Sequence, residues 1–235
     1  MLSVHSIDVY IKSSRILRDV SLEVGEGEVV CLIGRNGAGK TTTLRTVMGY
    51  LRPEKGTLSF RGVDIAKKST YEISRMGIGY APEDSGIFPD LTINENIEIS
   101  TWTRTTVKSE DERVKLAYEV FPVLKSYRER KGTQMSGGER KMLSIARALA
   151  LDAELFLLDE PFEGLSPAIV PQLAESIQEI TKMGPSMIIC ESNIYHVPDF
   201  TDLLFVIERG EIIFSGKPEE VAQEKDVLKI IAGTA

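Results

Sequence analysis

The sequence Gly34-Arg35-Asn36-Gly37-Ala38-Gly39-Lys40-Thr41 is the most informative stretch of this chain. It follows the apolar run Val29 to Ile33, which has the composition of a buried strand, and it leads into Thr41 to Met48, which has helix-forming spacing. The spacing of its glycines and of the final Lys-Thr pair is typical of loops that bind phosphate groups between a strand and a helix. We therefore predict an α/β fold with a phosphate-loop NTPase (RecA-like) core and a nucleotide site on this loop.

Each residue type in this loop has a physical task. Glycines let backbone N–H groups turn inward around a β-phosphate, and the N-terminus of the next helix adds the positive end of its dipole. Lys40 is expected to reach the β- and γ-phosphates, and the Thr41 hydroxyl is expected to bind Mg²⁺. A glycine-rich turn without a ligand is the alternative interpretation. We predict ATP and Mg²⁺ as cofactors, with ATP bound by Gly34, Arg35, Asn36, Gly37, Ala38, Gly39, Lys40, Thr41 and Thr42.

A second motif is an apolar run, Leu155 to Leu158, that ends in the carboxylates of Asp159 and Glu160. In α/β proteins ligands bind at the carboxyl ends of the parallel strands, which is where this pair is expected. Asp159 is predicted to hold Mg²⁺, and Glu160 to orient and deprotonate the water that attacks the γ-phosphate. The alternative is an acidic turn after a core strand.

The third motif, Ser136-Gly137-Gly138-Glu139, precedes a segment that runs to Leu149 with helical spacing. A serine followed three residues later by glutamate is a capping box, which is the plain interpretation. Two glycines in a first helical turn cost helix propensity of up to about 1 kcal/mol each, so a need for close backbone approach is indicated. We predict a second anion site here.

With these three motifs in this order, essentially the whole chain resembles the ATP-binding cassette (ABC) ATPases. The resemblance implies a head-to-tail dimer, as a homodimer or with a paralogous ATPase, in which Ser136, Gly137, Gly138 and Glu139 contact the ATP bound by the other subunit. It also implies ATP hydrolysis with Lys40 and Glu160 as catalytic residues, and work alongside integral membrane permease subunits. Further segments resemble the ATPase subunits of importers for branched-chain and other hydrophobic amino acids: Gly77 to Glu83, Ile87 to Thr92, Glu95-Asn96, Phe121-Pro122 and Glu163 to Pro167.

Three positions depart from the family pattern. Glu83 stands where a glutamine usually contacts Mg²⁺ and the attacking water; a carboxylate can still bind Mg²⁺ but adds negative charge near the γ-phosphate. Ser192 stands where the family has its switch histidine; it is predicted to be a third catalytic residue, because its hydroxyl can hydrogen-bond the γ-phosphate, although with a shorter reach and no charge. His196 is interpreted as a satisfied or surface histidine. Tyr10 is the aromatic candidate for stacking on adenine, although an alignment without gaps places Ile11 there, and neighbouring strand positions face opposite sides.

The remaining sequence predicts one domain over residues 1–235, with an inserted helical subdomain at about 84–151. An antiparallel β portion is expected near the N-terminus. Strands are predicted at 16–24, 28–33 and 57–60. In the second half, helices are predicted at 111–124, 168–183 and 219–231. The predicted parallel sheet continues through 155–158 and 187–190, and 203–207 with 211–214 is predicted to form a hairpin.

Composition excludes several classes of function. The chain has 235 residues, 28 Lys and Arg against 35 Asp and Glu, and a net charge of −7, which argues against unspecific binding to nucleic acid or anionic lipid. The first residues lack the pattern of a secretory signal, and no apolar run is long enough to span a membrane. We expect a cytoplasmic protein that is held at the inner face of the cell membrane by a permease.

The sequence thus predicts an ATPase subunit of an ABC importer, coupled indirectly to a solute-binding protein. Three alternatives remain open. An exporter ATPase is possible because transport direction resides in the membrane subunit, and a slow nucleotide-sensing module is conceivable because of Glu83 and Ser192. A chromosome- or ribosome-associated ATPase is disfavoured, since the stretch between Lys40 and Ser136 is too short for a long coiled coil.

Overall fold

The computed structural model describes residues 1–221 and 223–232. The chain divides into two compact units, Met1–Ile73 with Ser186–Ala235, and Ser74–Pro185, and each unit is described by itself. Within the described residues, none of the helices combines the length and the apolar character that crossing a membrane requires.

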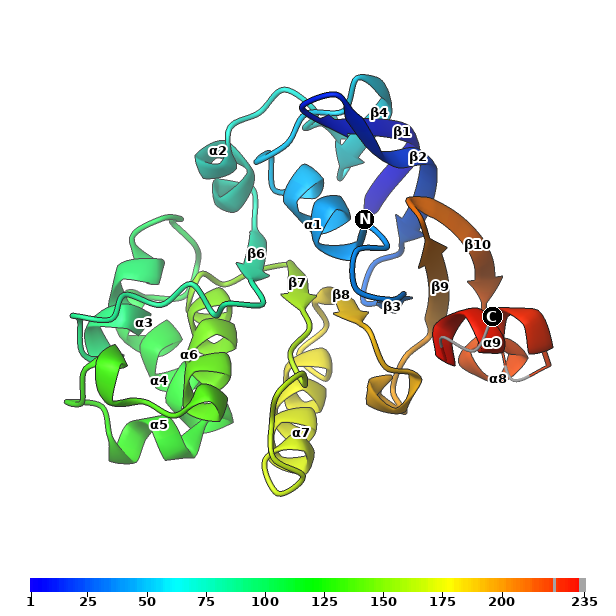
Figure 1. Ribbon diagram of the computed structural model, residues 1–235. Helices are drawn as coiled ribbons and strands as arrows, with labels where there is room; N and C mark the ends of the chain where they lie inside the picture. The colour runs from blue at the N-terminus through cyan, green and yellow to red at the C-terminus, as the bar shows by residue number, and fades with distance from the viewer. Residues whose placement is uncertain (222, 233–235) are drawn as a thin grey trace. The chain divides into compact units, whose positions relative to one another are not determined.

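The first unit begins with an antiparallel sheet of strand order β2-β1-β4-β5, which Figure 1 shows at the N-terminal end of the colour scale. Its strands are β1 (Leu2–Ile11), β2 (Ser14–Val24), β4 (Lys55–Phe60) and β5 (Val63–Asp64). The predicted antiparallel portion is confirmed. The sequence did not predict β1 because its alternation is interrupted: the left-handed backbone of Ser6 (φ 50°) shifts the register, and Ile7, Asp8 and Val9 are then all buried.

The same unit contains the strands that carry the phosphate loop. Strand β3 pairs in parallel with β8 and with β9, and β10 pairs with β9 as the predicted antiparallel hairpin. Every residue of β3 and of β8 is buried, as expected for parallel strands covered on both faces. Helix α1 (Lys40–Val47) follows the loop and packs against β2 and β8. The strands are β3 (Val29–Ile33), β8 (Ser186–Glu191), β9 (Leu203–Glu208) and β10 (Glu211–Gly216).

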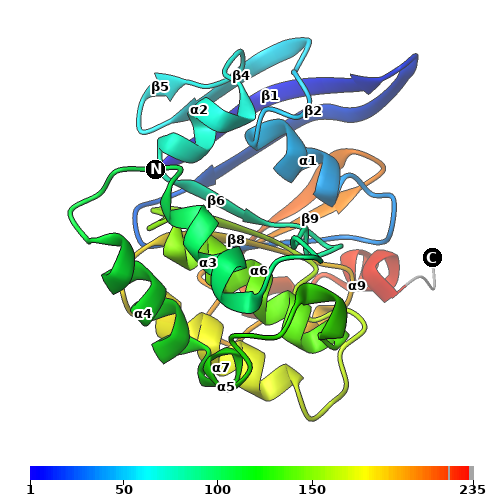
Figure 2. The same cartoon turned by 90° about the vertical axis from the view of Figure 1, so that its left-hand side faces the viewer.

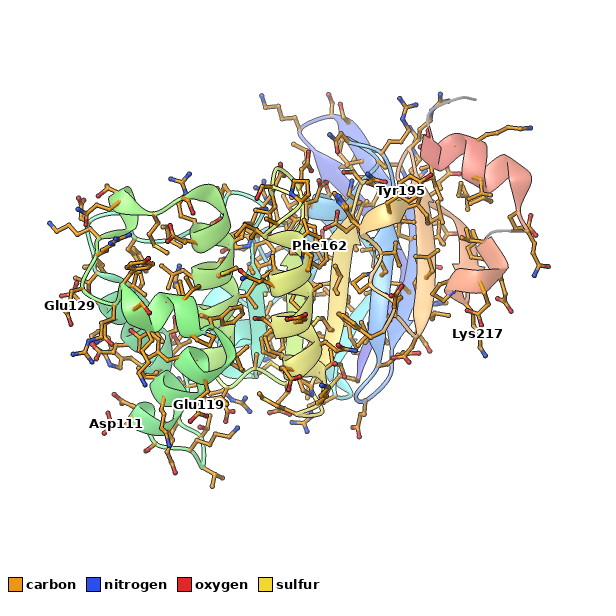
Figure 3. All side chains as sticks on the ribbon, turned by 90° about the horizontal axis from the view of Figure 1, so that it is seen from below. Asp111, Glu119, Glu129, Phe162, Tyr195 and Lys217 are labelled. Carbon is orange, nitrogen blue, oxygen red and sulfur yellow. The ribbon has the colours of Figure 1, made fainter. Side chains whose placement is uncertain are left out.

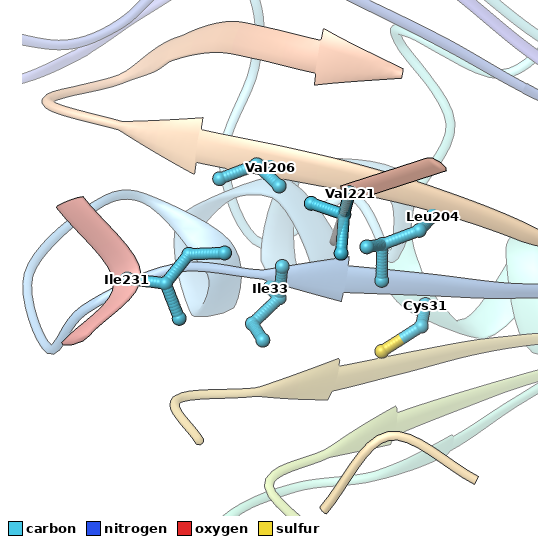
Figure 4. Close-up of a cluster of buried hydrophobic side chains, with 6 residues drawn as sticks. All are labelled: Cys31, Ile33, Leu204, Val206, Val221 and Ile231. Atoms are coloured by element: carbon cyan, nitrogen blue, oxygen red, sulfur yellow. The ribbon is translucent and has the colours of Figure 1, made fainter. Parts of the chain in front are cut away.

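Two short helices, α8 (Pro218–Val221) and α9 (Lys225–Ala232), cover part of this parallel sheet. Figure 4 shows Val221 and Ile231 facing side chains of β3 and β9, namely Cys31, Ile33, Leu204 and Val206, in one buried apolar cluster. The prediction of one continuous helix over 219–231 is wrong. The N–H groups of Gln223 and Glu224 donate to the carbonyls three residues earlier, and these turns separate the two helices. Ala222 lies outside the described residues.

The second unit combines a parallel strand pair with a group of helices. Strand β6 (Ile78–Ala81) pairs with β7 (Leu155–Asp159), and helices α3, α4 and α6 pack against one another, with α6 also against β6. Figure 2 shows these helices gathered on one side of the strands. The helices are α3 (Ile93–Thr101), α4 (Glu110–Val120), α5 (Pro122–Ser126), α6 (Gly137–Ala150) and α7 (Val170–Thr181); α2 (Thr70–Arg75) crosses the boundary between the units.

The helix predicted over 111–124 is interrupted. Helix α4 ends at Val120 and α5 begins at Pro122, because a proline ring disfavours helical dihedrals at the residue before it, and Phe121 has φ −120° and ψ 71°. The apolar face of the prediction is otherwise confirmed, since Phe121 and Leu124 are buried. Acidic side chains of α4 and the loop after α5 are exposed, as Figure 3 shows for Asp111, Glu119 and Glu129.

A buried arginine fastens the ends of two helices in this unit. Arg113 is 3% exposed, and its guanidinium donates to the carbonyls of Thr101 (2.9 Å) and Ala150 (3.2 Å), the last residues of α3 and α6. It also donates to the carbonyl of Arg104 (3.2 Å). The last carbonyls of a helix have no partner within the helix, so one cation satisfies both ends.

We expect Arg113→Met to lower the free energy of unfolding by about 1–3 kcal/mol, because it leaves buried carbonyls without donors. Urea-induced unfolding followed by circular dichroism measures the change. The control is Lys115→Met on the same helix, whose side chain is 77% exposed. Equal stability of the two variants would contradict the proposed fastening.

Candidate functional site

The predicted phosphate loop connects β3 with α1 in the first unit. The Gly34 N–H donates to the carbonyl of Glu191 at the end of β8 (3.1 Å), and the Ala38 N–H donates to the carbonyl of Arg35 (2.9 Å), which closes the loop on itself. Gly37 (φ 82°) and Gly39 (φ 121°) have left-handed backbones that glycine adopts without strain. Arg35, Asn36 and Gly37 form the exposed rim.

The N-terminus of α1 has the properties of an anion site. Its N-cap residue is Gly39, which has no side chain to accept from the first N–H groups of the helix. Lys40 is 3% exposed, and its ammonium group lies within the loop, where it donates to the carbonyls of Gly34 (2.6 Å) and Arg35 (3.3 Å). A buried cation and a helix N-terminus without a capping side chain together favour a phosphate.

Ser192 directly follows Glu191, whose carbonyl oxygen binds the loop. Strand β8 therefore places Ser192 next to the loop within the first unit. The Glu191 side chain is fully buried, and its Oε2 lies 3.2 Å from Nδ1 of His196. The interpretation of His196 as a satisfied histidine is confirmed by this contact.

Both candidates for contact with the base, Tyr10 and Ile11, lie at the end of strand β1. Val9 pairs with Leu17 of β2, and the Leu17 side chain packs against the phosphate loop, 2.8 Å from where a Cβ on Gly39 would lie. The pairing of β1 with β2 is irregular between Val9 and Tyr10, so alternation from Val9 does not decide which of Tyr10 and Ile11 faces the loop. Both side chains are partly exposed, Tyr10 to 36% and Ile11 to 42%. The role predicted for Tyr10 stays a prediction.

The two predicted carboxylates lie at the end of β7 in the second unit. Asp159 is 1% exposed and accepts a hydrogen bond from the Tyr80 hydroxyl at its Oδ2 (3.0 Å). Glu160 is 4% exposed and has a left-handed backbone with φ 48°. Its carbonyl oxygen accepts from the Lys141 ammonium group (2.7 Å) and from the Glu163 N–H (3.3 Å). The contacts of Tyr80 and Lys141 were not predicted from the sequence.

The third motif forms the N-terminus of α6 in the same unit. Ser136 is the N-cap: its hydroxyl accepts from the Glu139 N–H (3.3 Å), and the Glu139 carboxylate accepts from the Ser136 N–H (2.7 Å). The predicted capping box is therefore present. A Cβ on Gly137 would have no atom of the described residues within 4 Å, whereas one on Gly138 would lie 3.1 Å from Ile169 Cγ2. Packing within the described chain does not explain the glycine at 137.

Glu83 opens a loop that borders a cavity of about 670 Å³ in the second unit. The loop is held by Asn96 of α3, which is fully buried and bonds both the N–H (2.8 Å) and the carbonyl (2.9 Å) of Phe88. Arg147 of α6 donates to the carbonyl of Gly86 (2.5 Å) and lies over the Phe88 ring, 4.8 Å from its centre; burial lowers the pKa of its guanidinium. The cavity is lined by Glu83, Asp84, Ser85, Gly86, Ile87, Pro89, Gly132, Thr133, Gly137, Arg140, Lys141, Glu163, Gly164 and Leu165.

Comparison with known proteins identifies the class. The model of the ABC transporter family matches residues 17–163, and the chain belongs to this family. It is the ATP-binding subunit of an ABC transporter, an ATPase whose relatives form dimers and work with membrane permease components.

Among relatives, the chain is 36% identical to the high-affinity branched-chain amino acid transport ATP-binding protein BraG of Pseudomonas aeruginosa over 215 residues, which is 91% of each chain. It is 35% identical to the lipopolysaccharide export system ATP-binding protein LptB of Haemophilus influenzae over 224 residues, which is 94% of this chain and 92% of LptB. Among solved structures, it matches the ADP conformation of MJ1267, an ATP-binding cassette of an ABC transporter, with a TM-score of 0.83, 26% identity and coverage of 99% of this chain and 98% of that chain.

Proposed function

We propose that this chain is the ATPase subunit of an importer for branched-chain or other hydrophobic amino acids. The observation that carries the proposal is the 36% identity to BraG over nine-tenths of both chains, together with the segments around Glu83 and Glu163 that resemble this group. In this function the chain is cytoplasmic and is held at the inner face of the membrane by permease subunits. A solute-binding protein acts on it indirectly, through the permease.

An exporter ATPase is the second candidate, because LptB is similarly close in identity and coverage. The candidates differ in the solute and in how it reaches the permease. An amino-acid importer delivers solute to its permease through a binding protein, whereas LptB is named for lipopolysaccharide export. The selecting contacts of either system lie in subunits other than this chain.

Within the proposed function, each motif residue has one task. The N–H groups of the loop and the Lys40 ammonium group bind the phosphates of ATP, and Ser192 offers a hydroxyl to the γ-phosphate. Glu160 holds the attacking water and takes its proton. Because Mg²⁺ takes few protein oxygens besides phosphate oxygens and water, the Thr41 hydroxyl and the carboxylates of Asp159 and Glu83 are suitable donors. When bound, Mg²⁺ neutralises charge on the transferring phosphoryl group.

The N-terminus of α6 is proposed to contact the ATP of a second subunit through Ser136, Gly137, Gly138 and Glu139. The open space around Gly137 supports this role, because the glycine leaves room for a group from outside the chain. The dimer is formed either by two copies of this chain or with a paralogous ATPase, and nucleic acid has no part in it. Closure of the dimer around ATP would then pull on the permease, and hydrolysis would reset it.

The solute class is tested by purifying the tagged chain with its membrane partners from the cells that produce it and identifying those partners. After reconstitution in vesicles, ATP hydrolysis is measured with and without the associated binding protein loaded with leucine, isoleucine or valine. Stimulation by the loaded binding protein supports the importer. Partners of the lipopolysaccharide-export type, with no dependence on these amino acids, would establish the second candidate.

We expect Glu160→Gln to reduce steady-state hydrolysis at least about 100-fold, because the amide cannot accept the proton of the water. ATP binding should persist, and size-exclusion chromatography with ATP should show a stabilised dimer. Phosphate release gives the rate. Full turnover in this variant would remove Glu160 from its role.

We expect Gly137→Ala to leave the chain at least as stable as the original, since alanine favours helix by up to about 1 kcal/mol and the space around it is open. The same methyl group would obstruct a nucleotide presented by the second subunit, so the ATPase rate should fall. Thermal unfolding and phosphate release measure the two effects. A stable variant with an unchanged rate would count against the proposed contact.

We expect Glu83→Gln to raise turnover roughly threefold to tenfold at low magnesium concentration, because it removes a negative charge near the γ-phosphate. The magnesium concentration for half-maximal rate should fall as well. Titration of the ATPase rate with magnesium at saturating ATP provides the measurement. If neither quantity changes, Glu83 does not act at this position.

A further inference from the structure

The backbone of Glu160 is held in an unfavourable conformation. Residues with a side chain rarely adopt φ near 48°, and glutamate lacks the short polar side chain that lets asparagine or aspartate do so. Such a conformation persists only where surrounding contacts impose it. Glu160 is 4% exposed and directly follows the fully buried strand β7. A small rotation of its peptide would change where its carboxylate lies.

One contact to the Glu160 peptide comes from α6. The Lys141 ammonium group donates to the Glu160 carbonyl at 2.7 Å, a charge-assisted bond shorter than the 3.3 Å turn bond from the Glu163 N–H to the same oxygen. Hydrogen bonds from a charged donor are about twice as strong as neutral ones. Lys141 is therefore the stronger of the two donors to this carbonyl.

Lys141 is itself held in place by the helix that carries it. It lies two residues after Glu139 of the capping box, and the next residues of α6, Met142 and Leu143, are buried in the core of the unit. The stem of Lys141 is half-buried and lines the cavity that Gly137 and Glu83 also border. The donor thus moves with the N-terminus of α6.

We propose that Lys141 is a positioning residue for hydrolysis, which fixes the Glu160 peptide and thereby joins the N-terminus of α6 to the hydrolytic carboxylate of the same chain. The inference rests on the proposed role of Glu160. If contact with nucleotide displaces the N-terminus of α6, the hydrogen bond from Lys141 then transmits this displacement to the Glu160 peptide. Lys141 acts on the rate of the chemical step and leaves ATP binding to the phosphate loop.

The test compares the full chain with Lys141→Met, which keeps the apolar stem, and Lys141→Gln, which keeps a shorter neutral donor. At concentrations that support the dimer, we expect kcat to fall roughly tenfold in Lys141→Met, as small misplacements of catalytic groups do, and less in Lys141→Gln. The KM and the Kd for ATP, measured with a fluorescent ATP analogue, should stay within about twofold. Lys141→Arg should restore kcat because its guanidinium can reach the same carbonyl.

Lys115→Met on α4 is the matched control and should retain the original kcat, since its side chain is 77% exposed and forms a surface ion pair with Glu119. In the Glu160→Gln background, Lys141→Met should cause no further loss, because both changes act on one step. Unchanged kcat in the folded Met and Gln variants, loss of ATP affinity with kcat retained, or failure of Arg to restore the rate would each overturn the inference. Full activity of Glu160→Gln alone would instead overturn the proposed role of Glu160.

Discussion

The phosphate loop depends on the close approach of two glycines to neighbouring backbone. A Cβ on Gly34 would lie 2.3 Å from the carbonyl oxygen of Ile207, and one on Gly210 would lie 2.0 Å from that of Ile16. Both distances are far below contact distance, so β2, the loop and the turn after β9 meet only because these residues lack side chains. The Gly210 N–H then donates to the Ala38 carbonyl (2.8 Å), and the Gly210 carbonyl accepts from the Arg18 N–H (2.8 Å). The anion site at α1 is built on this junction.

A second constraint is the burial of the two carboxylates at the end of β7. Asp159 and Glu160 lie at the end of a buried strand, where polar groups without hydrogen-bond partners would be costly. The Tyr80 hydroxyl donates to the Asp159 carboxylate, and the Lys141 ammonium group donates to the Glu160 carbonyl. The helix that supplies Lys141 begins at the serine-glycine-glycine motif. Helix α6 therefore carries both the serine-glycine-glycine motif, which is proposed to contact a second subunit, and the lysine that is proposed to position the hydrolytic carboxylate.

Much of the fold followed from local patterns. Buried runs predicted β3, β7 and β8, and the Arg209-Gly210 turn predicted the β9–β10 hairpin, since each signal is contained within a few residues. The predictions failed where the backbone conformation of a single residue overrides the pattern of apolar side chains. Strand β1 was not predicted because a left-handed residue interrupts its alternation. The helix predicted over 111–124 is broken at Phe121, because the restriction that Pro122 places on the backbone before it outweighs the continuous apolar face.

By itself the sequence determined the class of chemistry, because phosphate binding needs glycines, a lysine and a hydroxyl at fixed spacing, and that spacing is visible along the chain. Only the tertiary structure decided how the motif residues are supported. Asn96 holds the Glu83 loop from a neighbouring helix, Arg147 holds it from α6, and Lys141 reaches Glu160 across 19 residues of sequence. Such contacts join segments that only folding brings together, so no local pattern in the sequence encodes them.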